Sequence, residues 1–192
     1  AHAPLARGGH VRPFGHGGAR PARGGSGASL GRRQCKGGGE ALGAASPEIA
    51  ALGERAPEQL EACRPRMAPE VHRRCRHVVT ENQRVLDSVA ALRAGDLARF
   101  GRLLDASHAS LRDDYQVSCP EVDLLVELAR ALPGVLGARI TGAGFGGSTV
   151  NLLAAEAVDP FRERVLEEYR RRTGLEPRLL VTAAAGGARG TR

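Results

Sequence analysis

The sequence predicts an α+β fold, in which helices cover one face of a short antiparallel sheet. Two observations predict it. Apolar residues recur at steps of three and four residues in three long segments between about residues 69 and 132. After Pro133-Gly134 a strand pattern takes over, interrupted once by a charged helical pattern. The 192 residues, 42% of them apolar, are enough for one compact core.

The three helical segments begin and end at clear signals. The first begins near Pro69 and ends at Gly95, because glycine commonly ends helices. Asp96 is placed to cap the second, and Ser118-Cys119-Pro120-Glu121 opens the third. We therefore expect three helices before the first of these strands.

The strand segments surround a glycine-rich run. Ala138–Ile140 leads into it and Thr149–Leu153 follows it, as in a hairpin. Asp159-Pro160 then begins a charged helix that Gly174 ends. Residues 177–181 form the last predicted strand.

Four regions are predicted along the chain. Residues 1–39 are a disordered segment rich in glycine and arginine, because no apolar periodicity offsets the entropy of ordering them. Residues 40–70 are a connector with short helices, one opened by Ser46-Pro47 and one by Ala56-Pro57. Residues 71–183 form one domain, and residues 184–192 are a disordered tail.

The charge is unevenly distributed. Of the 28 basic residues, seven lie in residues 1–39, which hold no acid; the other 21 match the 21 acidic residues. Two Arg-Gly-Gly triplets, at Arg7 and Arg23, leave an RNA-binding tail open as a minor alternative. No nucleic-acid partner is expected for the neutral remainder of the chain.

Several function classes are disfavoured. No run of apolar residues approaches the length of a membrane span. The four cysteines have neither the spacing of a zinc site nor that of a disulfide framework, so reduced thiols in a cytoplasmic protein are expected. No metal site is predicted.

The glycine-rich run is the candidate site. Gly142, Gly144, Gly146 and Gly147 permit positive φ angles and close approach of a ligand to the backbone, and such loops bind anions through amide groups. No Lys-Ser/Thr pair follows, and no helix opens after it, which excludes the common phosphate loop and the dinucleotide loop. On pattern alone, a tight turn between strands is equally well supported.

Other ionisable residues offer weaker candidates. Asp113 and Asp114 are adjacent and point to different sides of a helix, so a solvated helix end is expected. His77 and Glu81 are interpreted as a helix surface with one local ion pair. His108 lies on an apolar face and is expected to be a hydrogen-bonded core histidine. No general base stands out.

Three linked segments resemble galactokinases of the GHMP kinase superfamily: HVVTENQRV (77–85), ASHASLRDDYQVSCPEVD (106–123) and GARITGAGFGGSTVNLL (137–153). The resemblance covers the carboxy-terminal half of that family. It implies a GHMP kinase carboxy-terminal domain with a ferredoxin-like antiparallel sheet. It also implies ATP and Mg²⁺ as cofactors and phosphorylation of galactose at its anomeric hydroxyl.

The resemblance assigns the loop a place beside the phosphate and the sugar. The implied loop residues are Gly142, Ala143, Gly144, Phe145, Gly146, Gly147 and Ser148. Ser148 stands where many members of the family have a cysteine. Asp105 stands where they usually have an asparagine, and Asp105 is expected to lie on a helix surface.

No segment of the chain resembles the family's sugar-binding stretch, nucleotide loop or catalytic Asp and Arg. We therefore predict no catalytic residue in this chain and no turnover by the chain alone, because positioning and charge stabilisation dominate phosphoryl transfer. The alternative is a non-catalytic galactokinase-like sensor or binding protein.

Overall fold

The computed structural model describes residues 8–14, 35, 52, 56–142 and 144–183. Its strands are β1 (Gly8–Phe14), β2 (Val135–Thr141), β3 (Ser148–Leu153) and β4 (Glu176–Thr182). Its helices are α2 (Pro57–Cys63), α3 (Pro69–Arg93), α4 (Leu97–Asp113), α5 (Pro120–Arg130), α6 (Val158–Pro160) and α7 (Leu166–Thr173). Short 3-10 turns occur at Arg64–Arg66 and Ala155–Ala157, and a π-helical turn at Phe161–Val165 joins α6 to α7.

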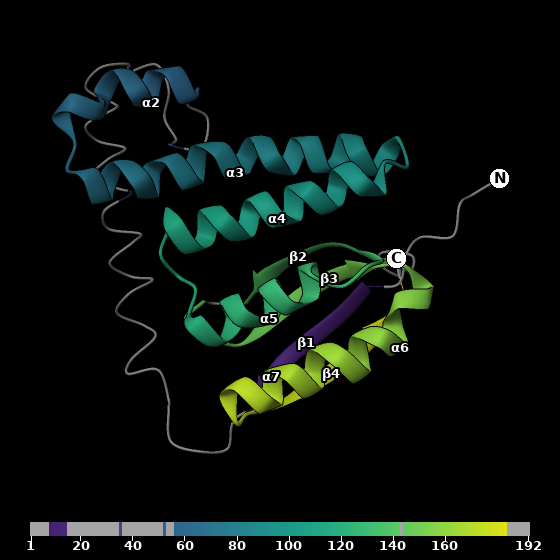
Figure 1. Ribbon diagram of the computed structural model, residues 1–192. Helices are drawn as coiled ribbons and strands as arrows, with labels where there is room; N and C mark the ends of the chain where they lie inside the picture. Colours follow the sequence, from purple (N-terminus) through teal and green to yellow (C-terminus); the bar gives the residue numbers. More distant parts are fainter. Residues whose placement is uncertain (1–7, 15–34, 36–51, 53–55, 143, 184–192) are drawn as a thin grey trace, which may run out of the picture.

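The four strands form one antiparallel sheet in the order β2-β3-β1-β4 (Figure 1). Helix α5 and the segment from α6 to α7 cover one face of this sheet. The core between them consists of Leu125, Val126, Ala129, Leu132, Ala138, Leu153, Ala157, Val158, Phe161, Val165 and Tyr169. The prediction of an α+β, ferredoxin-like sheet with helices on one face is confirmed.

Strand β1 differs from the sequence prediction, which placed Gly8–Phe14 in a disordered segment. It lies between β3 and β4, so its backbone pairs on both sides. The segment GGHVRPF does not alternate apolar and polar residues and begins with two glycines, so no local pattern predicts a strand there. Pro13 lies beyond Val11, the last residue of β1 that pairs with β3, so its missing N–H leaves that ladder intact.

The predicted helix boundaries are largely confirmed. Asp96 caps α4 by accepting a hydrogen bond of 2.8 Å from the backbone N–H of Arg99. Gly95 and Gly174 have φ angles of +70° and +69°, as expected where helices end. The short helix predicted from Pro47, apart from Leu52, and the predicted tail 184–192 lie outside the described residues.

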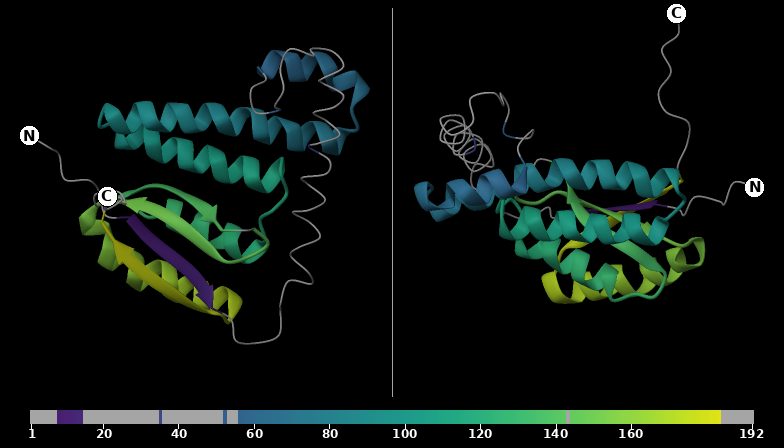
Figure 2. Two further views of the ribbon diagram at one scale, coloured as in Figure 1. Left: turned by 180° about the vertical axis from the view of Figure 1, so that it is seen from behind. Right: turned by 90° about the horizontal axis from the view of Figure 1, so that it is seen from above.

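Helices α3 and α4 form a second layer beside the sheet: α3 packs on α4, and α4 lies along β2 (Figures 1 and 2). The approach of α4 to β2 depends on two glycines. A Cβ atom at Gly101 would lie 2.0 Å from the carbonyl oxygen of Leu136, and one at Gly137 would lie 2.1 Å from the carbonyl oxygen of Gly101. Only glycine allows the two backbones to be this close.

No helix among the described residues is long and apolar enough to cross a membrane.

Candidate functional site

The candidate site is the loop between β2 and β3, closed at its base by the pairing of Thr141 with Ser148. The φ angles are +100° at Gly142, +85° at Gly144, +127° at Gly146 and +102° at Gly147. These values occur where side chains are disfavoured, so the glycines are required by the backbone path. Ala143 lies outside the described residues.

The middle of the loop is attached to the connector between α4 and α5. The backbone N–H of Phe145 donates a hydrogen bond of 2.6 Å to the carbonyl oxygen of Val117. Phe145 and Gln116 are the two described non-glycine residues with positive φ, +57° and +59°, and they lie on the two sides of this contact. Such strain persists only where the surrounding structure enforces it, which marks this contact as well determined.

The glycines of the loop differ in their surroundings. A Cβ atom at Gly144 would lie 2.8 Å from both the Cβ and the carbonyl oxygen of Val117, whereas one at Gly142 or Gly146 would meet nothing within 4 Å. One side of the loop is therefore packed and the other is open. The open side is the side that a ligand can approach.

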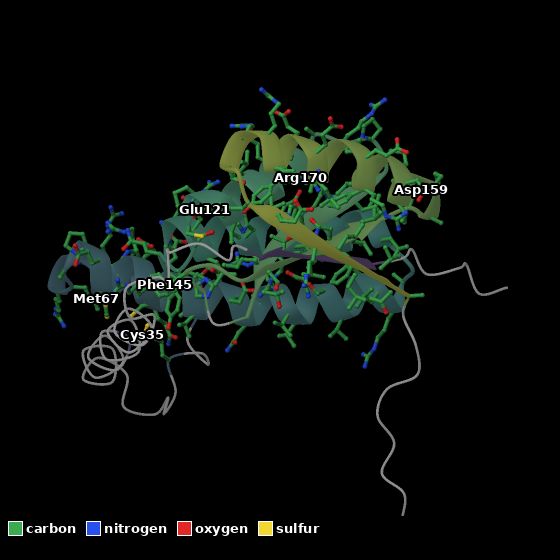
Figure 3. The ribbon with its side chains drawn as sticks, turned by 90° about the horizontal axis from the view of Figure 1, so that it is seen from below. Cys35, Met67, Glu121, Phe145, Asp159 and Arg170 are labelled. Carbon is green, nitrogen blue, oxygen red and sulfur yellow. The ribbon has the colours of Figure 1, made fainter. Side chains whose placement is uncertain are left out.

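A cavity of about 130 Å³ lies beside the loop. It is lined by Leu111, Tyr115, Val117, Arg139, Ile140, Gly142 and Gly144. In Figure 3, Phe145 lies at the same end of the molecule as Met67 and Glu121, and Asp159 lies at the opposite end. A larger groove of about 440 Å³ lies between α5 and α7, lined by residues that include Leu128, Leu132 and Arg164, and shares no lining residue with the loop cavity.

Arg139 supplies the charge in the wall of the cavity. Its Nε donates to the carbonyl oxygen of Ile140 at 3.0 Å, and its Nη1 lies 3.4 Å from Oε1 of Glu81 on α3. Glu81 also accepts from Ser107 and from Arg84. Burial raises the pKa of the Glu81 carboxyl, but the hydrogen bonds from Ser107 and Arg84 outweigh burial and hold the pKa below its ordinary value.

A second polar network continues behind the cavity. The Ser110 hydroxyl donates to Oδ2 of Asp114 at 3.1 Å, so Nδ1 of His77, 3.0 Å from the same hydroxyl oxygen, must be the donor in that contact. Asp114 also pairs with Arg76, and the His77 ring lies 4.8 Å from that of Tyr115. Burial lowers the pKa of His77 below its ordinary value, against the attraction of Glu81.

These contacts correct two sequence predictions. His77 is buried and does not lie on a helix surface. Glu81 forms one local ion pair, with Arg84, but it also bonds to Ser107 on α4 and to Arg139 on β2. Asp113 is exposed as predicted, but Asp114 is buried and paired. The predictions fail because α4 covers this side of α3, which the pattern of either helix alone does not reveal.

The chemistry available at the loop is electrostatic. The cavity lining contains backbone amides, one phenol and one guanidinium, and no carboxylate or imidazole. Among the described residues, no group of three or more His, Cys, Asp or Glu side chains is arranged to hold a metal ion. The described lining of the cavity is thus suited to stabilise an anion.

Known proteins are similar to this chain in sequence and in fold. The family described as GHMP kinases C terminal matches residues 88–171. Galactokinase of Roseiflexus sp. is 46% identical over 156 residues, which are 81% of this chain and 40% of that protein. Human galactokinase is 49% identical over 158 residues, 82% of this chain and 38% of that protein.

A solved structure is similar as well. The crystal structure of Lactococcus lactis galactokinase complexed with galactose matches with a TM-score of 0.85 and 33% identity, over 95% of this chain and 46% of that one. The chain therefore spans less than half the length of these relatives. The predicted resemblance to the carboxy-terminal half of the galactokinases is confirmed.

Proposed function

Because the chain contains the carboxy-terminal domain of the GHMP kinases and is homologous to galactokinases, we propose that it forms one wall of a galactose kinase site. The reaction is transfer of the γ-phosphoryl group of ATP to the anomeric hydroxyl of galactose in the cytoplasm. The observation that carries the proposal is the open side of the loop at Gly142 and Gly146. At both glycines a Cβ atom would meet no described protein atom within 4 Å, which leaves room for a substrate beside the backbone.

The role of the loop follows from the charge distribution in phosphoryl transfer. Charge spreads over the oxygens of the transferred group, so fixed dipoles and cations nearby stabilise the transition state. The loop is hydrogen-bonded to Val117, and Arg139 is hydrogen-bonded to Glu81, so both groups are oriented before a substrate binds. Both are supports of the site and not proton carriers.

We expect the groups that bind Mg²⁺ and activate the sugar hydroxyl to lie outside this wall. The described residues hold no metal-binding cluster, and the loop cavity contains no base. No step of the mechanism is therefore assigned to metal-binding residues of this chain. We expect the chain alone to show no release of ADP that depends on galactose.

A chimera tests the proposal. In it, residues 8–183 of this chain, which include β1 between β3 and β4, replace the matching carboxy-terminal part of Roseiflexus sp. galactokinase, to which this chain is 46% identical. The expected result is ATP-dependent phosphorylation of galactose by the chimera and none by the chain alone. A folded chimera that binds galactose without phosphorylating it contradicts the proposal, as does turnover by the chain alone.

A further inference from the structure

Strand β2 is at the edge of the sheet, and α4 occupies the place of a further strand. An edge strand presents a row of unpaired backbone groups. Here two outward N–H groups, two residues apart, are bonded by side chains of α4. Ala138 N–H donates to Oδ1 of Asp105 at 2.9 Å, and Ile140 N–H donates to Nδ1 of His108 at 3.3 Å.

Asp105 and His108 are three residues apart, so they lie on the same face of α4 as neighbours along its axis. The close approach of Gly101 to Gly137 brings this face within reach of the strand. The expectation that Asp105 lies on a helix surface is therefore wrong, because its carboxylate is bonded to the sheet edge. The expectation that His108 is a hydrogen-bonded core histidine is confirmed.

The hydrogen bond from Ile140 defines the protonation of His108. Because Nδ1 accepts, the proton of the neutral ring must be on Nε2. Nε2 lies 3.3 Å from Oδ1 of Asp123 on α5, close enough for attraction although not aligned as a hydrogen bond. Ser118 donates to the same carboxylate oxygen, which fixes Asp123 in turn.

We propose that His108 is a positioning residue for the glycine loop. Ile140 is two residues before Gly142, so a bond that fixes its N–H fixes the direction in which β2 enters the loop. The connector that follows α4 holds the other side of the loop through Val117 and Phe145. Helix α4 and its connector thus hold the loop at two points, and the importance of this for phosphoryl transfer rests on the function proposed above.

The arrangement requires a neutral imidazole. Protonation would place a proton on Nδ1, facing the Ile140 N–H, so two donors would oppose each other and the bond would be lost. Burial lowers the pKa of His108 below its ordinary value. The charged groups around the ring are Asp123 and Arg130 of α5 and Asp105, Arg112 and Asp113 of α4.

The direction of the pH effect follows. In the folded protein the His108 ring stays neutral, and keeps its bond, until the pH falls through its folded-state pKa. Because this pKa lies below the unfolded-state pKa, the contribution of the neutral ring to stability is complete above the unfolded-state pKa. The contribution is lost as the pH falls from there through the folded-state pKa. The loop should therefore keep its position near pH 7 and change it in acid. This change should be observable without any substrate.

Nuclear magnetic resonance of the full chain tests the proposal through the loop itself. In the unmodified chain the ring nitrogens should report a proton on Nε2, and the amide signals of Gly144, Phe145 and Gly147 should shift with the ionisation of His108. In His108→Leu the Ile140 amide should exchange with solvent about tenfold faster, the equivalent of losing about 1.4 kcal/mol of protection. In His108→Gln the side-chain oxygen can accept from Ile140, so protection should be restored and the acid-induced shift should disappear.

The matched control is His72→Gln, which changes a buried histidine on α3 that lies beside Glu61. It should leave the pH response of the loop unchanged. A proton on Nδ1 at neutral pH, unchanged Ile140 exchange in His108→Leu, or an unchanged acid shift in His108→Gln would each overturn the proposal. If His108→Leu does not fold, two other measurements test the proposal: the tautomer of His108 in the unmodified chain, and the pH dependence of the loop amide signals in His108→Gln.

The outcomes separate this inference from the proposed function. The resonance measurements need no substrate. If the loop amide signals shift with the ionisation of His108 but the chimera does not phosphorylate galactose, the proposed function is rejected and the inference stands. If the chimera is active but the loop amide signals do not shift with the ionisation of His108, the inference is rejected and the proposed function stands.

Discussion

Two sets of glycines lie close together in this fold and are needed for different reasons. Gly101 and Gly137 lie where α4 meets β2, and there a Cβ atom would overlap backbone atoms of the other element. Gly142 and Gly146 lie in the loop beyond β2, where a Cβ atom would meet nothing but the backbone has positive φ. The first pair is required by packing and the second by conformation, so substitutions should damage the fold in one case and the site in the other.

The largest effect is expected for Gly101→Ala. The new Cβ would lie 2.0 Å from the Leu136 oxygen, and moving α4 away from β2 would break the bonds that Asp105 and His108 make to the strand. We expect a loss of about 4 kcal/mol or more in the free energy of unfolding, measured by urea denaturation. Gly95→Ala is the control: its Cβ meets nothing within 4 Å, and its φ of +70° should cost about 1 kcal/mol. Equal losses in the two variants would contradict the packing argument.

Gly144→Ala tests a glycine that is required both by packing and by backbone conformation. Its φ is +85°, and its Cβ would lie 2.8 Å from Val117. Strain and overlap should together cost about 2 to 3 kcal/mol in the free energy of unfolding. The amide of Phe145, which bonds to Val117, should exchange faster with deuterium. Retained protection at Phe145 would show that the loop does not depend on this contact.

Gly142→Ala should separate stability from function. Its φ of +100° is strained for alanine, but the open side of the loop lets the backbone relax, so the free energy of unfolding should fall by only about 1 to 2 kcal/mol. In the chimera with Roseiflexus sp. galactokinase, kcat/KM for galactose should fall at least about tenfold, because small displacements disturb phosphoryl transfer. A variant with unchanged kcat/KM would remove the loop from the proposed site.

The smallest effect concerns the support of Arg139. The pKa of Glu81 lies below its ordinary value, so its stabilising contribution is complete above the unfolded-state pKa, about 4.3, and is lost as the pH falls through the folded-state value. Glu81→Gln should cost about 1 kcal/mol at pH 7 and should reduce the acid dependence of unfolding below about pH 5. An acid dependence equal to that of the unmodified chain would contradict this assignment.

Local features of the fold were predictable from the sequence, and contacts between elements were not. The caps at Asp96 and Gly174 and the glycine loop itself depend on residues adjacent in the chain, and the structure has them where they were expected. Strand β1 and the bonds of Glu81 to α4 and β2 depend on partners far along the sequence. The roles of Asp105 and His108 were hidden for the same reason, because a polar residue on a helix does not indicate which N–H group it will bond.

The π-helical turn at Phe161–Val165 has a consequence for changes in chain length. A π turn holds about one residue more than the α turn it replaces, and the helices on both sides keep their faces toward the core. Deleting one of the three exposed residues of this turn, 162 to 164, should therefore yield a continuous α-helix with Tyr169 still buried. Deleting one residue in α7 before Tyr169 would instead rotate that ring by about 100° away from the sheet. The domain thus contains one place in this helical segment where evolution can shorten the chain without rebuilding the core.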